Sequence, residues 1–201
     1  MSTHQYDERL HHLLRTAADV FAEQGYHATS MRDLSKATGM SLAGMYYYVR
    51  CKDELLYQIQ ERCFMGVLEG AQTALESGTD PGDSIDRLIR HHVTFFTEHM
   101  SEMKVLSHEA DSLTQERQES IDSLKKQYVT LLADLIGDAQ GEGAKADKRV
   151  ATYALFGMMN WIYTWYDPKG EIEPDQLAEQ FSEVFLHGIL TATTSAIPNG
   201  G

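Results

Sequence analysis

Three consecutive tyrosines, Tyr46 to Tyr48, are the residues whose type and spacing indicate chemistry most clearly. A phenol hydroxyl can donate a hydrogen bond to a phosphate oxygen, and its ring can pack along a sugar or a thymine methyl group. Lys52 follows them and adds a positive charge that attracts phosphate. Because three tyrosines on an exposed helical turn would lower solubility, the cluster favours non-covalent contact with a DNA duplex.

Two short helices joined by a tight turn are predicted to position these side chains. Ser30 can cap the first helix, in which Leu34 and Ala37 turn the apolar side inward. Gly39 supplies the backbone freedom that a tight turn between helices requires. A helix–turn–helix of this kind offers its second helix to the major groove of DNA.

The second short helix is predicted to divide its residues between the core and solvent. Met45 and Val49 lie four residues apart, so they face the core together. The positions left for other contacts are Leu42, Ala43, Gly44, Tyr46, Tyr47 and Tyr48.

The candidate DNA contacts divide by position into phosphate contacts and base-reading contacts. Ser30 with the backbone at its helix start, Tyr47 and Lys52 are expected to contact phosphates, since helix N-termini and lysines attract them. The residues expected on or beside the groove-facing surface are Ser41, Leu42, Ala43, Gly44, Tyr46 and Tyr48. The small Ala43 and Gly44 permit close approach to the duplex, and the neighbouring leucine can meet a thymine methyl group.

This segment resembles the DNA-binding domain of the tetracycline-repressor-like (TetR) family of bacterial transcription regulators. The closing run of the family's motif is matched by Tyr46, Tyr47, Tyr48, Val49, Lys52, Asp53 and Leu55, and the end of its first helix by Phe21, Gly25, Tyr26 and Thr29. One departure is Cys51, where a serine or an asparagine is more usual. The resemblance implies a ligand-responsive repressor that binds a palindromic double-stranded DNA operator as a homodimer.

The negative charge of the chain lies mostly outside the predicted DNA-binding segment. The whole chain has a formal net charge of −13, but residues 1–62 hold seven Lys or Arg against eight Asp or Glu, which leaves −1 there and −12 elsewhere. Because phosphate contact requires basic side chains, this distribution lessens the conflict that the total charge creates. Arg32 either reaches a phosphate or pairs in the neighbourhood of Asp33.

The length and composition indicate a soluble protein with a full hydrophobic core. The chain has 201 residues, of which 42% are hydrophobic. No apolar run approaches the roughly 18 to 20 residues of a membrane span, and the polar start has no signal-peptide core. We therefore expect a cytoplasmic protein without a membrane partner.

The apolar periodicity predicts an all-α fold of about nine helices. Helices beyond the DNA-binding segment are expected at residues 52–75, 84–99, 103–109, 114–139, 147–166 and 174–196, after a support helix at residues 7–24. The expected organisation is a helix–turn–helix domain at residues 1–51, a ligand-binding and dimerisation domain at residues 52–196, and a disordered tail at residues 197–201.

The last two predicted helices are more apolar than one core requires. Residues 147–166 are apolar almost all round, with small residues at Ala151, Ala154 and Gly157 where another helix can approach. A helix that is apolar on every side must be covered twice. We expect these helices to form a four-helix interface with a second copy, the alternative being burial within one monomer.

Soft and aromatic side chains in the larger domain are candidates for a hydrophobic effector pocket. The residues chosen are Phe64, Met65, Phe96, Met103, Tyr128, Met158, Trp161 and Trp165. Each of them can also be ordinary core. The segments at residues 160–170 and 108–110 resemble the branch of the family that senses acyl-CoA thioesters, which implies an acyl-CoA effector with its phosphates near Arg87, Arg90 or Lys125.

Metal, redox and enzymatic readings are the alternatives. His91, His92, His99 and His108 could bind zinc or nickel, but adjacent histidines point about 100° apart on a helix, so we expect no metal. Cys51 and Cys63 lie too far apart for a disulfide within one helix, and a redox role for the first is a minor alternative. The rival classes are an all-α enzyme and a protein-binding helix–turn–helix. No nucleophile elbow, phosphate loop, CxxC pair or HExxH run occurs, which disfavours the enzyme.

Overall fold

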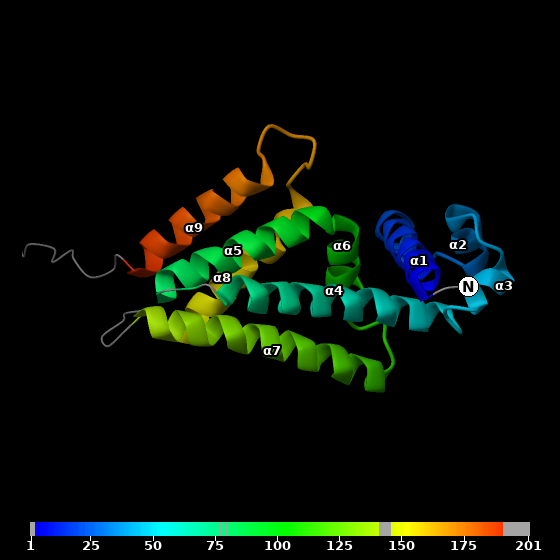
Figure 1. Cartoon of the computed structure of the whole chain (residues 1–201), viewed down its shortest axis with the longest axis horizontal. Coiled ribbons are helices and arrows are strands. Elements are labelled where there is room, and N and C mark those ends of the chain that lie inside the picture. The colour runs from blue at the N-terminus through cyan, green and yellow to red at the C-terminus, as the bar shows by residue number, and fades with distance from the viewer. Residues whose placement is uncertain (1–2, 77, 79, 141–145, 191–201) are drawn as a thin grey trace, which may run out of the picture. The chain divides into compact units, whose positions relative to one another are not determined.

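The computed structural model describes residues 3–76, 78, 80–140 and 146–190, and within them all regular structure is helical (Figure 1). The helices are α1 (Thr3–Gln24), α2 (Met31–Thr38), α3 (Leu42–Tyr46), α4 (Lys52–Leu75), α5 (Pro81–Glu98), α6 (Met100–His108), α7 (Gln115–Gln140), α8 (Lys148–Asn160), the 3-10 turn η1 (Ile162–Thr164) and α9 (Pro174–Leu190). The predicted all-α fold is confirmed. The tail expected at residues 197–201 lies outside the described residues.

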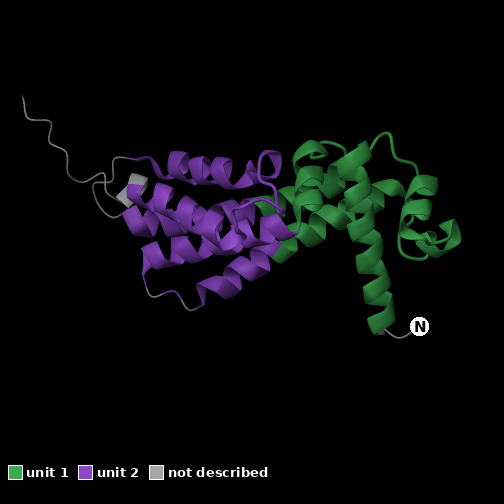
Figure 2. Ribbon diagram, turned by 90° about the horizontal axis from the view of Figure 1, so that it is seen from above, with its two compact units in different colours: residues 1–66, 99–125 green, residues 67–98, 126–201 purple. Residues whose placement is uncertain are grey.

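The chain divides into two compact units, which Figure 2 shows in different colours. Unit 1 comprises residues 1–66 and 99–125, and unit 2 comprises residues 67–98 and 126–201. Helices α4 and α7 therefore contribute residues to both units. The first compact unit continues beyond residue 51. The predicted boundary between a DNA-binding domain at residues 1–51 and a ligand-binding domain at residues 52–196 therefore stays a prediction.

Unit 1 is built around a core to which α1, α2, α3, α4 and α6 contribute. Leu34 and Met45 are fully buried in it; α2 packs on α1, and α3 packs on α2. The expectation that Ala37 faces inward is wrong, because this residue is exposed and Thr38 is buried in its place. The Thr38 hydroxyl can be buried because it donates a hydrogen bond to the carbonyl oxygen of Leu34 in the same helix, at 2.8 Å.

Unit 2 has its own apolar core, in which α5 packs most extensively on α9. Its fully buried side chains include Ile85, Leu88, Ile89, Leu132, Ile136 and Leu155. Helix α8 ends at Asn160 rather than continuing to Tyr166 as expected, because the chain tightens into η1 and Thr164 N donates to the carbonyl oxygen of Trp161 at 3.1 Å. None of the described helices has the length and apolar character of a membrane span.

Candidate functional site

The turn between α2 and α3 is held by side-chain caps at both helix starts. Ser30 and Asp33 form a reciprocal capping box, in which Asp33 N donates to Ser30 Oγ at 3.3 Å and Ser30 N donates to the Asp33 carboxylate at 3.0 Å. Hydrogen bonds from Ser30 lower the pKa of Asp33. Gly39 closes α2 at φ +68°, and Ser41 Oγ caps α3 by accepting from Gly44 N at 3.0 Å.

The capping hydrogen bonds of Ser30 affect the predicted contact between this residue and a DNA phosphate. Its hydroxyl donates to the Asp33 carboxylate at 2.6 Å, so a negative charge already lies at the start of α2. A phosphate approaching that helix start meets this carboxylate. The expected contact at Ser30 would therefore need the cap to rearrange, and it stays a prediction.

Two of the three tyrosines are exposed and the third is buried. Tyr46 is 50% and Tyr47 66% exposed, whereas Tyr48 is only 8% exposed. The Tyr48 ring packs on Tyr6 of α1 with ring centroids 4.9 Å apart. The expected exposure of all three is wrong for Tyr48, because α3 ends at Tyr46 and the following turn directs Tyr48 back to the core.

The other predicted base-reading positions lie at the start of α3. Ser41 and Ala43 are exposed, while Leu42 and Gly44 are half-buried. A Cβ atom on Gly44 would lie 3.2 Å from Ser41 Oγ, so a larger residue would press on the cap. Arg32 is exposed on α2 and takes part in none of the ion pairs found in the described chain, which favours the phosphate alternative over pairing near Asp33.

The ammonium group of Lys52 is used inside unit 1. Its Nζ donates to the carbonyl oxygens of Tyr26 at 2.7 Å and Thr29 at 2.8 Å, and it lies 4.3 Å from the centroid of the Tyr26 ring. This lysine therefore joins the loop between α1 and α2 to the start of α4. The premise that its charge is available to phosphate is not supported by this geometry.

Replacing Lys52 with methionine is expected to destabilise the protein without changing the number of contacts that it makes with DNA phosphates. The variant leaves two carbonyl oxygens without their charged donor, so we expect the free energy of unfolding, measured in urea, to fall by about 1 to 3 kcal/mol. The dependence of duplex affinity on salt should not change. Arg32→Met is the matched control, for which we expect unchanged stability and a salt slope lower by about one. If Lys52→Met also lowered the dependence of duplex affinity on salt, Lys52 would contact a phosphate after all.

The eight predicted effector residues do not share one environment. Phe64, Met65 and Met103 belong to unit 1, and Phe96, Tyr128, Met158, Trp161 and Trp165 belong to unit 2. Phe96, Met103 and Tyr128 are buried, and Phe64 and Met158 are half-buried. Met65, Trp161 and Trp165 are exposed to solvent in the single chain, which does not support the expectation that they line an enclosed cavity.

His92 and Tyr128 form a buried polar pair in the core of unit 2. His92 Nδ1 lies 2.9 Å from the Tyr128 hydroxyl, and the rings of Phe96 and Phe156 lie 3.8 and 6.2 Å from the imidazole centroid. Burial lowers the pKa of His92 to about 3, with a further contribution from the neighbouring His91. Burial also raises the pKa of Tyr128. Both groups are therefore neutral near pH 7.

Sequence reasoning did not find this pair. The sequence suggests His92 for a metal and Tyr128 for an effector, because 36 residues separate them and no local pattern connects them. The other histidines are placed apart, with His91 Nε2 donating to the carbonyl oxygen of Val67 at 2.9 Å and His108 exposed. Among the described residues, no three His, Cys, Asp or Glu side chains are grouped to hold a metal ion.

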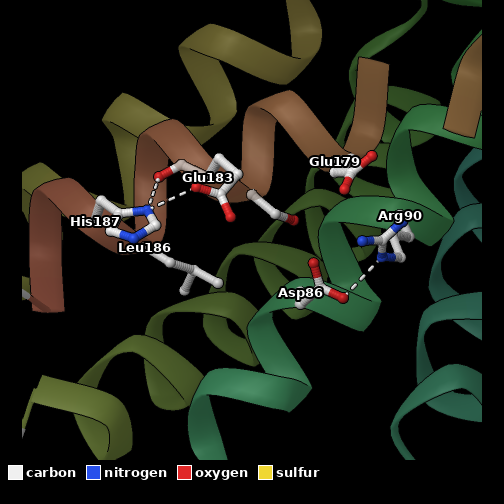
Figure 3. Close-up of a pocket in the computed structure, with 7 residues that line it drawn as sticks. Asp86, Arg90, Glu179, Glu183, Leu186 and His187 are labelled. Carbon is white, nitrogen blue, oxygen red and sulfur yellow. Dashed lines mark hydrogen bonds and ion pairs between the residues drawn. The ribbon is translucent and has the colours of Figure 1, made fainter. Parts of the chain in front are cut away.

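A polar hollow of about 140 Å³ lies between α5 and α9, and Figure 3 shows its lining. Its lining residues are Asp86, Arg90, Glu179, Ser182, Glu183, Leu186 and His187. None of the predicted effector residues lines it. The basic residues proposed for coenzyme phosphates are already ion-paired, Arg87 with Asp83 and Arg90 with Asp86 at 2.7 Å each, and Lys125 with Asp122 at 3.5 Å.

The cysteines differ in environment. Cys51 is exposed before α4, and Cys63 is buried with its Sγ 3.8 Å from Met103 Sδ. Burial raises the pKa of Cys63, which keeps that thiol protonated. Neither cysteine forms a disulfide.

Two family models match consecutive parts of the chain. Residues 13–59, which include the capped turn and the exposed tyrosines, match the model described as bacterial regulatory proteins of the tetR family. Residues 78–189 match the model of the tetracyclin repressor-like C-terminal domain. The chain belongs to the TetR family. It is a transcription regulator of that family.

Individual TetR-family proteins resemble the chain over nearly its whole length. The HTH-type transcriptional repressor KstR2 of Mycobacterium tuberculosis is 24% identical over 189 residues, which cover 92% of this chain and 94% of that protein. The structure of AibR in complex with isovaleryl coenzyme A and operator DNA has a TM-score of 0.78 at 28% identity, covering 88% and 97% of the two chains. PfmR from Thermus thermophilus has a TM-score of 0.80 at 28% identity, covering 87% and 97%.

Proposed function

We propose that this TetR-family regulator is a cytoplasmic homodimeric repressor that binds a palindromic operator and releases it when a hydrophobic effector, an acyl-CoA, occupies unit 2. The observation that carries the DNA-binding part is the capped α2–α3 turn, which leaves Tyr46 and Tyr47 exposed beside the start of α3. The family match over residues 13–59 supports it. Ser41, Leu42, Ala43 and Gly44 are the accompanying groove-facing residues.

The dimer is proposed on an exposed apolar face of α8 and α9. Its large exposed residues are Val150 and Tyr153 on α8, Trp161, Trp165 and Ile172 in the segment between the two helices, and Val184 on α9. On α8, residues 150, 153 and 157 recur at helical spacing, so they share one side, and Trp161 follows directly at the helix end. A Cβ atom at Gly157 would meet nothing within 4 Å, which leaves room for a close helix. Exposed apolar patches of this kind mark interaction sites.

The effector is proposed from two relatives of the chain. AibR was solved with isovaleryl coenzyme A and operator DNA, and KstR2 is named a transcriptional repressor. In this chain, buried aromatic side chains of unit 2 would hold the acyl group. Helix α4 contributes residues to both units and would transmit binding to the DNA-reading unit. A coupling of about 1 to 3 kcal/mol, roughly 5- to 150-fold in affinity, is enough to vacate an operator.

The DNA-binding proposal is tested by selecting a duplex from a random pool and measuring its affinity by fluorescence anisotropy. Tyr47→Phe removes one exposed hydroxyl, so we expect roughly 10-fold weaker binding to selected and unselected duplexes alike, in the range of a hydrogen bond to a charged group. Tyr48→Phe is the matched control, and its buried ring should leave affinity within about twofold. Steep loss of affinity with salt marks phosphate contacts. Recovery of no duplex would favour a protein-binding helix–turn–helix instead.

A further inference from the structure

His92 is the ionisable side chain at the centre of the unit 2 core. It is 1% exposed and packs against Phe96, Tyr128 and Phe156. Its Nδ1 has a hydrogen-bond partner in the Tyr128 hydroxyl, but its Nε2 makes no hydrogen bond of normal geometry. A buried polar atom without a partner reduces stability, so this atom needs a functional reason.

The Tyr128 hydroxyl determines which nitrogen of His92 carries the proton. A tyrosine hydroxyl has a single proton to donate, and the buried Tyr128 hydroxyl has His92 Nδ1 as its hydrogen-bond partner at 2.9 Å. When the hydroxyl donates, Nδ1 is the acceptor and the ring proton of neutral His92 lies on Nε2. The buried core of unit 2 thus holds an N–H donor that the Asn160 side chain influences but does not meet in a hydrogen bond of normal geometry.

We propose that Nε2–H of His92 donates a hydrogen bond to the thioester carbonyl oxygen of the bound acyl-CoA. This assignment rests on the proposed function and names the group of the effector that unit 2 recognises. A carbonyl oxygen supplies the acceptor that Nε2 lacks. The surrounding aromatic rings are apolar, and in such a medium a hydrogen bond is stronger than in water.

The same geometry disfavours a free carboxylic acid as the effector. The core around His92 keeps the imidazole neutral, so a carboxylate placed there would be buried without an opposite charge. A thioester is neutral and avoids that cost. The side chain of the exposed Asn160 opposes the lowering of the His92 pKa as a hydrogen-bonding group, although Nε2 forms no hydrogen bond of normal geometry.

Entry of an acyl group requires side chains near His92 to move. Met158 and Met159 lie at the end of α8, where their flexible thioether side chains can repack around a ligand. The Phe96 ring lies 3.8 Å from the imidazole centroid, so a carbonyl group that reaches His92 would have to displace this ring or pass beside it. The proposed site would therefore open on binding.

The inference is tested with decanoyl-CoA, with decyl-CoA, whose thioether differs from it only in lacking the carbonyl oxygen, and with free decanoate, which lacks the coenzyme. In calorimetric titrations of the whole wild-type protein, we expect decanoyl-CoA to bind about 3- to 10-fold more tightly than decyl-CoA, the effect of one neutral hydrogen bond. Decanoate should bind much more weakly than either. In His92→Phe, the two CoA ligands should bind equally well.

Asn160→Ala provides the matched control, and it should keep the preference for the thioester. Should His92→Phe fail to fold, ¹⁵N-histidine spectra of the wild-type protein give an independent readout. The Nε2 resonance of His92 should then shift with decanoyl-CoA and not with decyl-CoA.

The outcomes separate this inference from the proposed function. Equal affinity of the wild-type protein for both CoA ligands, a preference that persists in His92→Phe, or its loss in Asn160→Ala would overturn the role of His92 while leaving an acyl-CoA effector in place. Binding of neither CoA ligand would remove the proposed effector itself, and the role of His92 with it.

Discussion

A glutamate in place of Tyr153 is expected to separate the protein into monomers and to remove most of its affinity for a palindromic operator. Tyr153 lies on the exposed apolar face of α8. In a two-fold dimer each substitution occurs twice, and a charge buried in the centre of an interface costs about 2 kcal/mol or more per copy. The dimer dissociation constant should therefore rise roughly 1000-fold or more.

Analytical ultracentrifugation and operator anisotropy measure this effect. Val184→Glu on α9 should act in the same way, because its side chain is also exposed on the proposed face. Thr130→Glu, at an exposed position of α7, adds the same charge elsewhere and should leave the dimer intact. Dimers that survive both apolar-face substitutions would show that this face is not the interface.

Lowering the pH from 7 to 4.5 is expected to destabilise the wild-type protein through His92. Burial holds the pKa of folded His92 at about 3, against an ordinary value of 6.5. Between these values the unfolded chain binds a proton that the folded chain refuses, so the free energy of unfolding falls as the pH falls. At pH 4.5 the loss from this residue is about 2 to 3 kcal/mol. His91 and Asn160 are the neighbouring groups that act on the pKa of this ring, and Tyr128 is its hydrogen-bond partner.

Urea unfolding at both pH values isolates the contribution of His92. His92→Phe keeps an aromatic ring but cannot take up a proton, so its stability should fall by about 2 to 3 kcal/mol less than that of the wild-type protein over the same interval. His11→Gln replaces an exposed histidine of α1 whose ring stays in water, and it should follow the wild-type protein. A pH dependence of His92→Phe identical to the wild type would refute the assigned burial effect.

Local sequence patterns predicted the helix–turn–helix well because its determinants are local. The capping serines, the turn glycine and the fully buried Met45 each act over four residues or fewer. The prediction failed for Tyr48 because five residues make too short a helix for periodicity to extend past its end. The next turn, rather than the helical repeat, sets the direction of that ring.

The effector domain was less predictable from the same patterns. Apolar and aromatic composition marked Tyr128 and Phe96 as candidates, and both are buried. It marked Trp161 and Trp165 equally, although both are exposed. Composition reports that a side chain is apolar, but it does not tell whether its own core or a second molecule covers it.

The sequence by itself determined that this protein is all-helical, that residues 29–56 form a DNA-binding motif, and that its last helices carry more apolar surface than one core needs. Only the tertiary structure decided that the Lys52 ammonium group donates hydrogen bonds to two backbone carbonyl groups and that His92 is hydrogen-bonded to Tyr128. The physical reason is distance along the chain. Helical periodicity tells which residues share a side, whereas the partners of a buried polar group are set by the packing of segments more than 20 residues apart.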